Sequence, residues 1–230
     1  MQIGGDVPQN RSLLRVQVVS GTMFSLFLLA HLFNQMLAAL GAAPYDAAQR
    51  ALRQGYQSPP VELALVLLPL LVHAAAGILR LWRRRIQGPR GPVSLAARLH
   101  RISGIILLIF FIGHVTATRG ASLIYGVFPE FAGVAFTLRW VPAYFWPYYT
   151  SFALAGLYHA VYGLSVALPV LGLRGGAGLR RPALLVPLVS VLGLALVLGL
   201  LSLGGILRDV GQPELSPYAR LVLRLTGKVR

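Results

Sequence analysis

The sequence of 230 residues contains no cysteine and only six acidic residues. Without cysteine the chain forms no disulfide bond, and it has no thiolate for a zinc site, an iron–sulfur cluster or the covalent attachment of c-type haem. Transporters driven by protons or cations usually carry carboxylates inside the membrane, so the scarcity of acids argues against that class. All six acids fall near the ends of apolar segments or in loops, at Asp6, Asp46, Glu62, Glu130, Asp209 and Glu214.

Long apolar stretches dominate what is present. Hydrophobic residues make up 56% of the chain, and the mean hydropathy is +0.69. A membrane-spanning helix needs about 20 mostly apolar residues, and five stretches meet this requirement. We therefore expect an all-α integral membrane protein, a single membrane domain over residues 1–230 without a cleavable signal peptide. The expected helices cover 16–41, 61–82, 102–118, 146–172 and 183–206, with a tail at 207–230.

The net charge of +15 comes from basic residues that lie between the apolar stretches, which does not indicate nucleic-acid binding. Seven lie in the segment 80–101 and three in the connection between the fourth and fifth helices, whereas the first and third connections carry two each. By the positive-inside rule, the N-terminus faces the cytoplasm and the C-terminus faces the outside of a bacterial-type cytoplasmic membrane. Five basic residues in the tail run against this rule.

Four histidines stand inside apolar stretches in two matched motifs. The first and third helices share S-G-x9-H, and the second and fourth share H-x3-G, so the helices form a two-helix repeat with a parallel orientation. A polar residue in the bilayer is a functional hypothesis by default, although each histidine could instead bond to a neighbouring helix. The motif residues are Ser20, Gly21 and His31; Ser103, Gly104 and His114; His73 and Gly77; and His159 and Gly163.

Depth along the helices predicts which histidines meet. At 1.5 Å per residue, His31 lies roughly 24 Å above Arg15, and His114 lies at a similar depth toward the outside. His73 is only about 10 Å from Arg80, toward the inside, and His159 is left as its partner. Two histidine pairs at different depths in a four-helix bundle suit two b-type haems, because imidazole is a standard iron ligand. Zinc fits less well, since it needs three or four convergent ligands.

The glycines and basic residues near these histidines have two interpretations each. The glycines either clear space for the haem macrocycles or allow close packing of helices. The basic residues either bind propionates of the inner haem or extend toward the membrane surface. These candidate residues are Gly21, Gly77, Gly104 and Gly163, with Arg80, His100 and Arg101.

Two segments outside the five helices have features of their own. The middle of the first loop, DAAQRALRQ, is compatible with a short surface helix. The connection 119–145 is rich in aromatic residues, which form either an interfacial belt or part of the wall of a quinone entrance. The candidate quinone contacts are Asn34, Gln35, Tyr45, Asp46 and Gln54.

The stretch HRISGIILLIFFIGH, together with SGTMFSLFLLAH and the spaced His73 and His159, resembles the dihaem cytochrome b membrane anchor of succinate:menaquinone oxidoreductases and fumarate reductases. The resemblance covers residues from about 10 to 206. It implies that His73 and His159 bind the inner haem and that His31 and His114 bind the outer one. It also implies flavoprotein and iron–sulfur subunits on the cytoplasmic face, an arginine-rich docking loop, and electron transfer to or from menaquinone.

Other functions are compatible with the same sequence. A dihaem cytochrome b of a hydrogenase, a formate dehydrogenase or an ascorbate-type transmembrane reductase would share the histidines but not the partner. A cofactor-free anchor or a transporter would bind no haem. Loss of one haem within the succinate family is disfavoured because all four histidines are present.

Overall fold

The computed structural model describes residues 8–87, 92–173 and 176–228. Three of the basic residues counted in the sequence, Arg90, Arg174 and Arg230, lie outside these ranges, as does Asp6. The described residues are helical with no strand, and five helices are long and apolar enough to cross a membrane. The protein is therefore a multi-pass membrane protein, as the sequence predicts.

The five long helices are bounded as follows. They are α1 (Pro8–Leu37), α4 (Leu68–Gln87), α5 (Leu95–Val115), α8 (Pro142–Val170) and α10 (Pro182–Leu203). Two of them are extended through a π-helical turn. α4 continues back through η2 (Leu63–Leu67) into α3 (Pro59–Glu62), and α5 continues through η3 (Thr116–Gly120) into α6 (Ala121–Tyr125).

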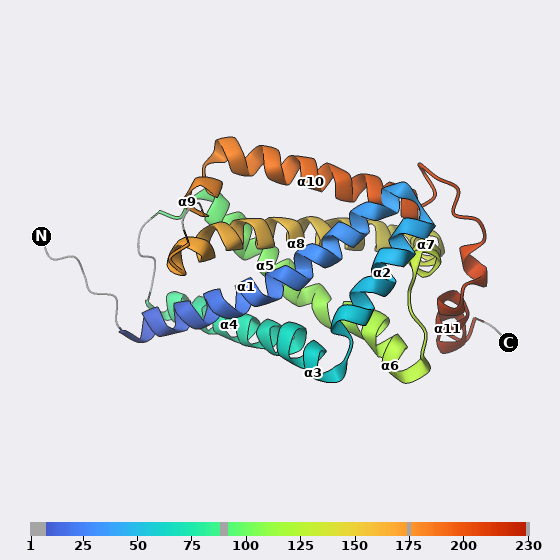
Figure 1. The fold of residues 1–230 in the computed structure, drawn as a ribbon, viewed down its shortest axis with the longest axis horizontal. Helices are drawn as coiled ribbons and strands as arrows, with labels where there is room; N and C mark the ends of the chain where they lie inside the picture. Colours follow the sequence, from blue (N-terminus) through green and yellow to red (C-terminus); the bar gives the residue numbers. More distant parts are fainter. Residues whose placement is uncertain (1–7, 88–91, 174–175, 229–230) are drawn as a thin grey trace, which may run out of the picture.

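The long helices lie side by side along the longest axis of the molecule (Figure 1). The start of α1, the end of α4, the start of α5 and the short α9 (Gly176–Leu179) lie at one end, which we call the inner end after the expected orientation. The other end, called the outer end, carries α2 (Ala42–Tyr56), α6, α7 (Phe131–Trp140) and α11 (Pro217–Leu225). A short η1 (Ala38–Leu40) joins α1 to α2, and η4 (Pro213–Leu215) precedes α11.

The helices of the repeat pack in a row rather than in a closed ring. α1 packs against α4 and α8, and α8 packs against α5, while α10 covers α1 and α8. Within the described residues, no extended backbone contact joins α4 to α5 or α8, or α1 to α5. The expected four-helix bundle therefore exists as two helix pairs, α1–α4 and α5–α8, that meet along α1 and α8. Between α1 and α5, and between α4 and α8, the contacts described below are made by side chains.

The third membrane helix is longer at both ends than predicted, covering 95–125 rather than 102–118. At its start, Ser94 caps the helix by accepting a hydrogen bond from the Ala97 amide at 3.3 Å, which satisfies one of the unpaired N–H groups of a first turn. At its end, the chain remains helical past Arg119 because a partner on the neighbouring helix neutralises that charge, as described below.

The π-helical turn η2 has a local cause in the sequence. Pro69 has no backbone N–H, and its ring collides with the carbonyl four residues earlier, at Leu65. The helix accommodates the proline by widening over Leu63–Leu67 just before it. π-helical turns of this kind occur frequently at functional sites.

The first loop forms a helix, as its sequence allows, and the aromatic connection contains one that the sequence did not predict. α2 carries Tyr45, which is buried against Phe131 of α7 with ring centroids 5.7 Å apart. Asp46 accepts a hydrogen bond from the Phe131 amide at 2.8 Å, so it holds the first turn of α7. Phe131 and Leu138 join Leu203 in a buried cluster at the outer end.

The C-terminal tail is a structured cap at the outer end. Ser216 caps α11 by accepting from the Ala219 amide at 3.1 Å. Tyr218 is buried and donates to the Ala117 carbonyl at 3.0 Å, which ties α11 to the third membrane helix. The Arg208 guanidinium donates to the Ala39 carbonyl at 2.7 Å. Arg220 donates to the Leu215 carbonyl at 2.8 Å, and the Lys228 ammonium lies over the Trp140 ring. Three basic residues of the tail therefore have local partners at the end that the expected orientation places outside.

Candidate functional site

The four motif histidines meet in two pairs, one between α1 and α5 and one between α4 and α8. His31 on α1 and His114 on α5 have ring centroids 6.0 Å apart, with an interplanar angle of 71°. His73 on α4 and His159 on α8 have centroids 5.9 Å apart, at 88°. These are the pairs that the depth along the helices predicts. We call them the outer pair and the inner pair.

The spacing within each pair can be tested against a metal bound between two imidazoles. A metal–nitrogen bond of ~2.0–2.1 Å, with the nitrogen about 1.1 Å from the ring centroid, puts two opposed centroids about 6.3 Å apart. The two observed separations lie close to this value. Among the described residues, no group of three or more His, Asp or Glu side chains is placed to hold a metal ion. Each pair therefore fits an axially coordinated metal such as haem iron better than zinc.

Hydrogen bonds define which nitrogen of each inner histidine is free. His73 Nδ1 lies 2.9 Å from the Gln17 carbonyl oxygen, and His159 Nδ1 lies 3.2 Å from the His100 carbonyl oxygen. A carbonyl only accepts, so both Nδ1 atoms carry the proton and both Nε2 atoms keep a lone pair. Metal-binding histidines are oriented in this way, by donation of the second ring N–H to a carbonyl.

The same arrangement occurs in both halves of the repeat. Gln17 and His100 each stand four residues before the glycine of the S-G motif, and each supplies the carbonyl that orients the inner histidine on the partner helix. The glycines complete the match. A Cβ on Gly21 would collide with the His73 ring, and a Cβ on Gly104 would lie 2.9 Å from His159 Cε1. These glycines therefore make room for the inner histidine rings themselves.

The second pair of glycines and the inner basic residues contact the groups that surround these rings. A Cβ on Gly163 would lie 3.3 Å from His100, and one on Gly77 would lie 3.2 Å from Gln17. The Arg80 guanidinium donates to the Gln17 side chain, and Arg101 donates weakly to the Ala97 carbonyl at 3.4 Å. The contacts of Arg80, His100 and Arg101 with haem propionates stay a prediction.

His100 is a fifth histidine at the inner pair but has a different geometry. Its ring stacks on His159 with centroids 4.1 Å apart and an interplanar angle of 17°. That distance is too short for a metal ion between the two faces. Its Nδ1 is buried without a hydrogen-bond partner among the described residues. His100 therefore packs on the face of the His159 ring and is not the second ligand of the pair.

The outer pair borders a large cavity, which we call the outer cavity. Its volume is about 850 Å³, within the ~300–1,000 Å³ typical of small-molecule and cofactor sites. His114 Nδ1 lies 3.2 Å from the Tyr148 hydroxyl, and the His31 ring stacks on Phe27. Part of the aromatic connection lines this cavity, with Phe128, Trp140, Tyr144 and Phe145 among the lining residues, and its role at a quinone entrance stays a prediction.

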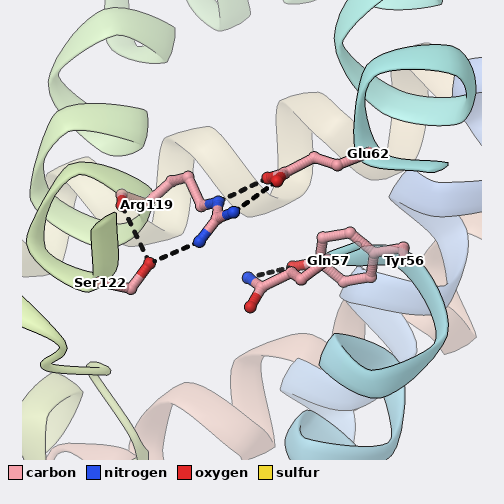
Figure 2. Close-up of polar contacts among 5 residues, drawn as sticks. All are labelled: Tyr56, Gln57, Glu62, Arg119 and Ser122. Atoms are coloured by element: carbon pink, nitrogen blue, oxygen red, sulfur yellow. Dashed lines mark hydrogen bonds and ion pairs between the residues drawn. The ribbon is translucent and has the colours of Figure 1, made fainter. Parts of the chain in front are cut away.

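A bidentate ion pair that no sequence pattern indicates is shown in Figure 2, and both of its residues line the outer cavity. Arg119 donates to the two Glu62 carboxylate oxygens at 2.6 and 2.5 Å and to Ser122 Oγ at 3.0 Å. Both charged side chains are about one-fifth exposed. The pair joins Glu62, the last residue of α3 before η2, to Arg119 inside η3, and Gln57 and Tyr56 lie beside it at the end of α2.

Arg53 also lines the outer cavity and was not among the site residues predicted from the sequence. Its Nη2 donates to Glu130 at 3.1 Å, and its guanidinium lies over the Phe128 ring, 4.2 Å from the centroid. Its Nη1 is buried and has no hydrogen-bond partner within the described residues. A buried cationic donor without an acceptor is costly, so a ligand oxygen in the outer cavity would be favoured there.

The five quinone candidates from the sequence separate into different places. Gln35 and Tyr45 line the outer cavity, where Tyr45 donates to Gln35 Oε1 at 3.3 Å. Burial raises the pKa of the Tyr45 phenol to about 12, so this hydroxyl stays protonated. Asn34 is fully buried on α1 and donates to Gln49. Asp46 is occupied by the start of α7, and Gln54 is exposed and lies outside the cavity wall.

In comparisons with known proteins, no protein family matches the chain, and no curated protein or solved structure gives a significant match.

Proposed function

We propose that the protein is a transmembrane electron conduit that holds two b-type haems, one between His31 and His114 and one between His73 and His159. The observation that carries this proposal is the pair geometry: two diagonal histidine pairs, each about 6 Å between ring centroids. The Nδ1 protons of the inner pair are already engaged by backbone carbonyls. Haem bound at these positions supplies one-electron carriers at two depths of the membrane.

The chain's own residues do the orienting in this proposal. The carbonyls of Gln17 and His100 accept from Nδ1 of the inner rings, which leaves both Nε2 atoms free to bind iron. Tyr148 engages His114 in the outer pair. α1 and α8 pack directly against each other, and each histidine pair joins two helices that have no extended backbone contact within the described residues, α1 with α5 and α4 with α8.

The test is the reduced-minus-oxidised spectrum of the purified chain with a pyridine haemochromogen count. We expect two b haems per chain, and one in either His73→Ala or His114→Ala. His100→Gln is the matched control, because it places in the second half the residue that the first half has at Gln17. It is expected to keep both haems. A chain without haem would leave a cofactor-free anchor, and retention of the inner haem in His73→Ala would contradict the assignment of His73 as its ligand.

We further propose that the outer cavity binds the head group of a menaquinone beside the outer haem position. Three groups support this: the buried Arg53 Nη1 without a partner, which suits a quinone carbonyl oxygen, the Glu62–Arg119 pair, and the Tyr45 hydroxyl with its raised pKa. Reduction of haem by a soluble naphthoquinol tests it with the chain alone. Arg53→Gln should slow the reduction about tenfold or more, for the loss of one hydrogen bond to a charged group.

Arg50→Gln is the control for this experiment. Arg50 also approaches Glu130, at 3.8 Å, but its side chain is 53% exposed and it does not line the cavity. Equal effects of the two substitutions would indicate a role for the charge near Glu130 and would remove Arg53 from the quinone site.

The resemblance of HRISGIILLIFFIGH to the succinate and fumarate family supports a third part of the proposal. In it, the chain anchors flavoprotein and iron–sulfur subunits at the inner end and exchanges their electrons with menaquinone. The described basic residues of that end, including Arg83, Arg84 and Arg85, suit an acidic docking surface. Co-purification from native membranes tests the partner: succinate-dependent haem reduction supports this assembly, whereas hydrogen- or formate-dependent reduction would assign the chain to another respiratory complex.

A further inference from the structure

A second hollow lies between α1, α2 and the π-helical turn η2, and we call it the tail groove. Its volume is about 670 Å³. The walls are almost wholly hydrocarbon, with Met23, Leu26 and Phe33 from α1, Ala51 from α2 and Leu65 from η2 among them. Leu26 and Phe33 are 70% and 60% exposed, so this part of the surface faces the membrane interior. Asn34 also lines the groove, but it is fully buried and its amide donates to Gln49, so the accessible wall is nearly all hydrocarbon and suits an apolar chain.

The tail groove and the outer cavity share a wall. Phe27, Tyr56 and Val66 line both spaces. Phe27 and Tyr56 meet edge to face with ring centroids 4.9 Å apart, and Phe27 stacks on His31 of the outer pair. Only these side chains separate an apolar groove on the lipid side from a cavity with polar groups beside a histidine pair. Aromatic side chains of this kind change rotamer without any movement of the helices.

The outer cavity is covered on the side away from the bundle. Tyr218 and Val222 of α11 line it, and the Tyr218 hydroxyl donates to Ala117. Gly133 of α7 packs so tightly under Tyr218 that a Cβ would lie 3.0 Å from it. A ligand with a long apolar chain therefore reaches the cavity most directly from the lipid side.

We propose that the tail groove holds the isoprenoid tail of the quinone whose head occupies the outer cavity, with the Phe27–Tyr56 pair as the passage between the two. This inference rests on the proposed quinone site and adds to it a binding site for the tail. The occupant follows from the shared wall: the groove is lined almost wholly by apolar side chains, lies along the membrane helix α1, and is separated only by the Phe27, Tyr56 and Val66 side chains from the cavity that takes the head group. A phospholipid acyl chain has no reason to end at that cavity.

The experiment uses the purified haem-loaded chain and naphthoquinols with zero, one, two and four isoprene units. Wild type should show an apparent affinity that rises with tail length, by about tenfold or more between zero and two units, because each buried methylene favours binding. Ala51→Trp fills the groove and should bring the ratio of tailed to tailless affinity close to one. Ala47→Trp is the matched control, because Ala47 is an exposed alanine on the same helix that lines neither space. It should keep the wild-type ratio.

The outcomes separate this inference from the function on which it rests. If the tailless quinol reduces the haem but tail length has no effect, or the effect survives Ala51→Trp, the tail site is wrong and the head-group site stands. If Ala51→Trp removes a co-purified phospholipid and leaves the tail-length effect intact, the groove belongs to a lipid acyl chain. If no quinol reduces the haem, the quinone site itself is wrong, and the tail site with it.

Discussion

Gly104 lies against the edge of the His159 ring, and a single methyl group there tests the inner site. In Gly104→Ala the new carbon would stand 2.9 Å from His159 Cε1 and 3.3 Å from Nδ1. Carbon atoms in contact sit about 3.5 Å apart or more, so the ring must retreat by about 0.6 Å. The Nδ1 contacts with the His100 carbonyl and Ser103 Oγ, at 3.2 and 3.3 Å, are lengthened or bent by such a movement.

The expected energy change is a difference of two effects. Overpacking in a tight site costs about 1–3 kcal/mol, and replacing a glycine inside a helix gains about 0.5–1 kcal/mol. We therefore expect a net destabilisation of about 1–2 kcal/mol, together with an altered spectrum or midpoint potential of the inner haem and an unchanged outer haem. The assays are thermal unfolding in detergent and a redox titration followed at the haem absorbance.

Gly113→Ala is the matched control on the same helix. A Cβ there meets no atom within 4 Å, so only the gain in helix propensity of about 0.5–1 kcal/mol is expected. Gly21→Ala should repeat the Gly104 result on the other half, because its Cβ would collide with His73. If Gly104→Ala and Gly21→Ala were both more stable than wild type and kept the wild-type inner haem, the close approach of these glycines to the histidine rings would be refuted.

Three further predictions concern the outer end. Burial raises the pKa of Asp46 above its ordinary 3.8, so its contribution stabilises the fold below that pH and is lost as the pH rises through the folded-state pKa. Asp46→Asn should remove this decline in unfolding temperature toward neutral pH, whereas Asp209→Asn, at an exposed aspartate, should retain it. Glu62→Gln should cost about 1–3 kcal/mol by leaving the Arg119 guanidinium unpaired, and adding Arg119→Gln should recover part of that loss; simple additivity would contradict the pair. Tyr148→Phe should lower outer-haem affinity about 10- to 100-fold, measured by haem retention on dilution, and full retention would contradict its role.

The membrane helices were predictable from the sequence, but their ends were not. Each helix has about 20 apolar residues, which identifies it without any knowledge of its neighbours. The third helix extends past Arg119 because Glu62 on another helix neutralises that charge. Hydropathy along one segment contains no information about such a partner. It therefore predicts that the third helix ends at 118, seven residues before its end at Tyr125.

The histidine pairs were predictable because depth along a helix depends only on residue count. Their role as haem ligands stays a prediction until haem is measured. The quinone contacts were harder, since Gln54 and Arg53 are adjacent on α2 and point about 100° apart. Both are polar, so the sequence does not say which faces the cavity. The fold decides it by burying Tyr45 of the same helix against α7.

The row order α4–α1–α8–α5 has a consequence for biogenesis. Each half of the repeat contains a helical hairpin with its own internal contact, α1 with α4 and α5 with α8, and the long helices of the two halves pack on each other through α1 and α8. Each histidine pair takes one ring from each hairpin. Neither hairpin alone therefore contains a complete site, and both pairs should form only after the second hairpin has inserted and docked. A chain truncated after α4 is expected to enter the membrane but to capture no haem.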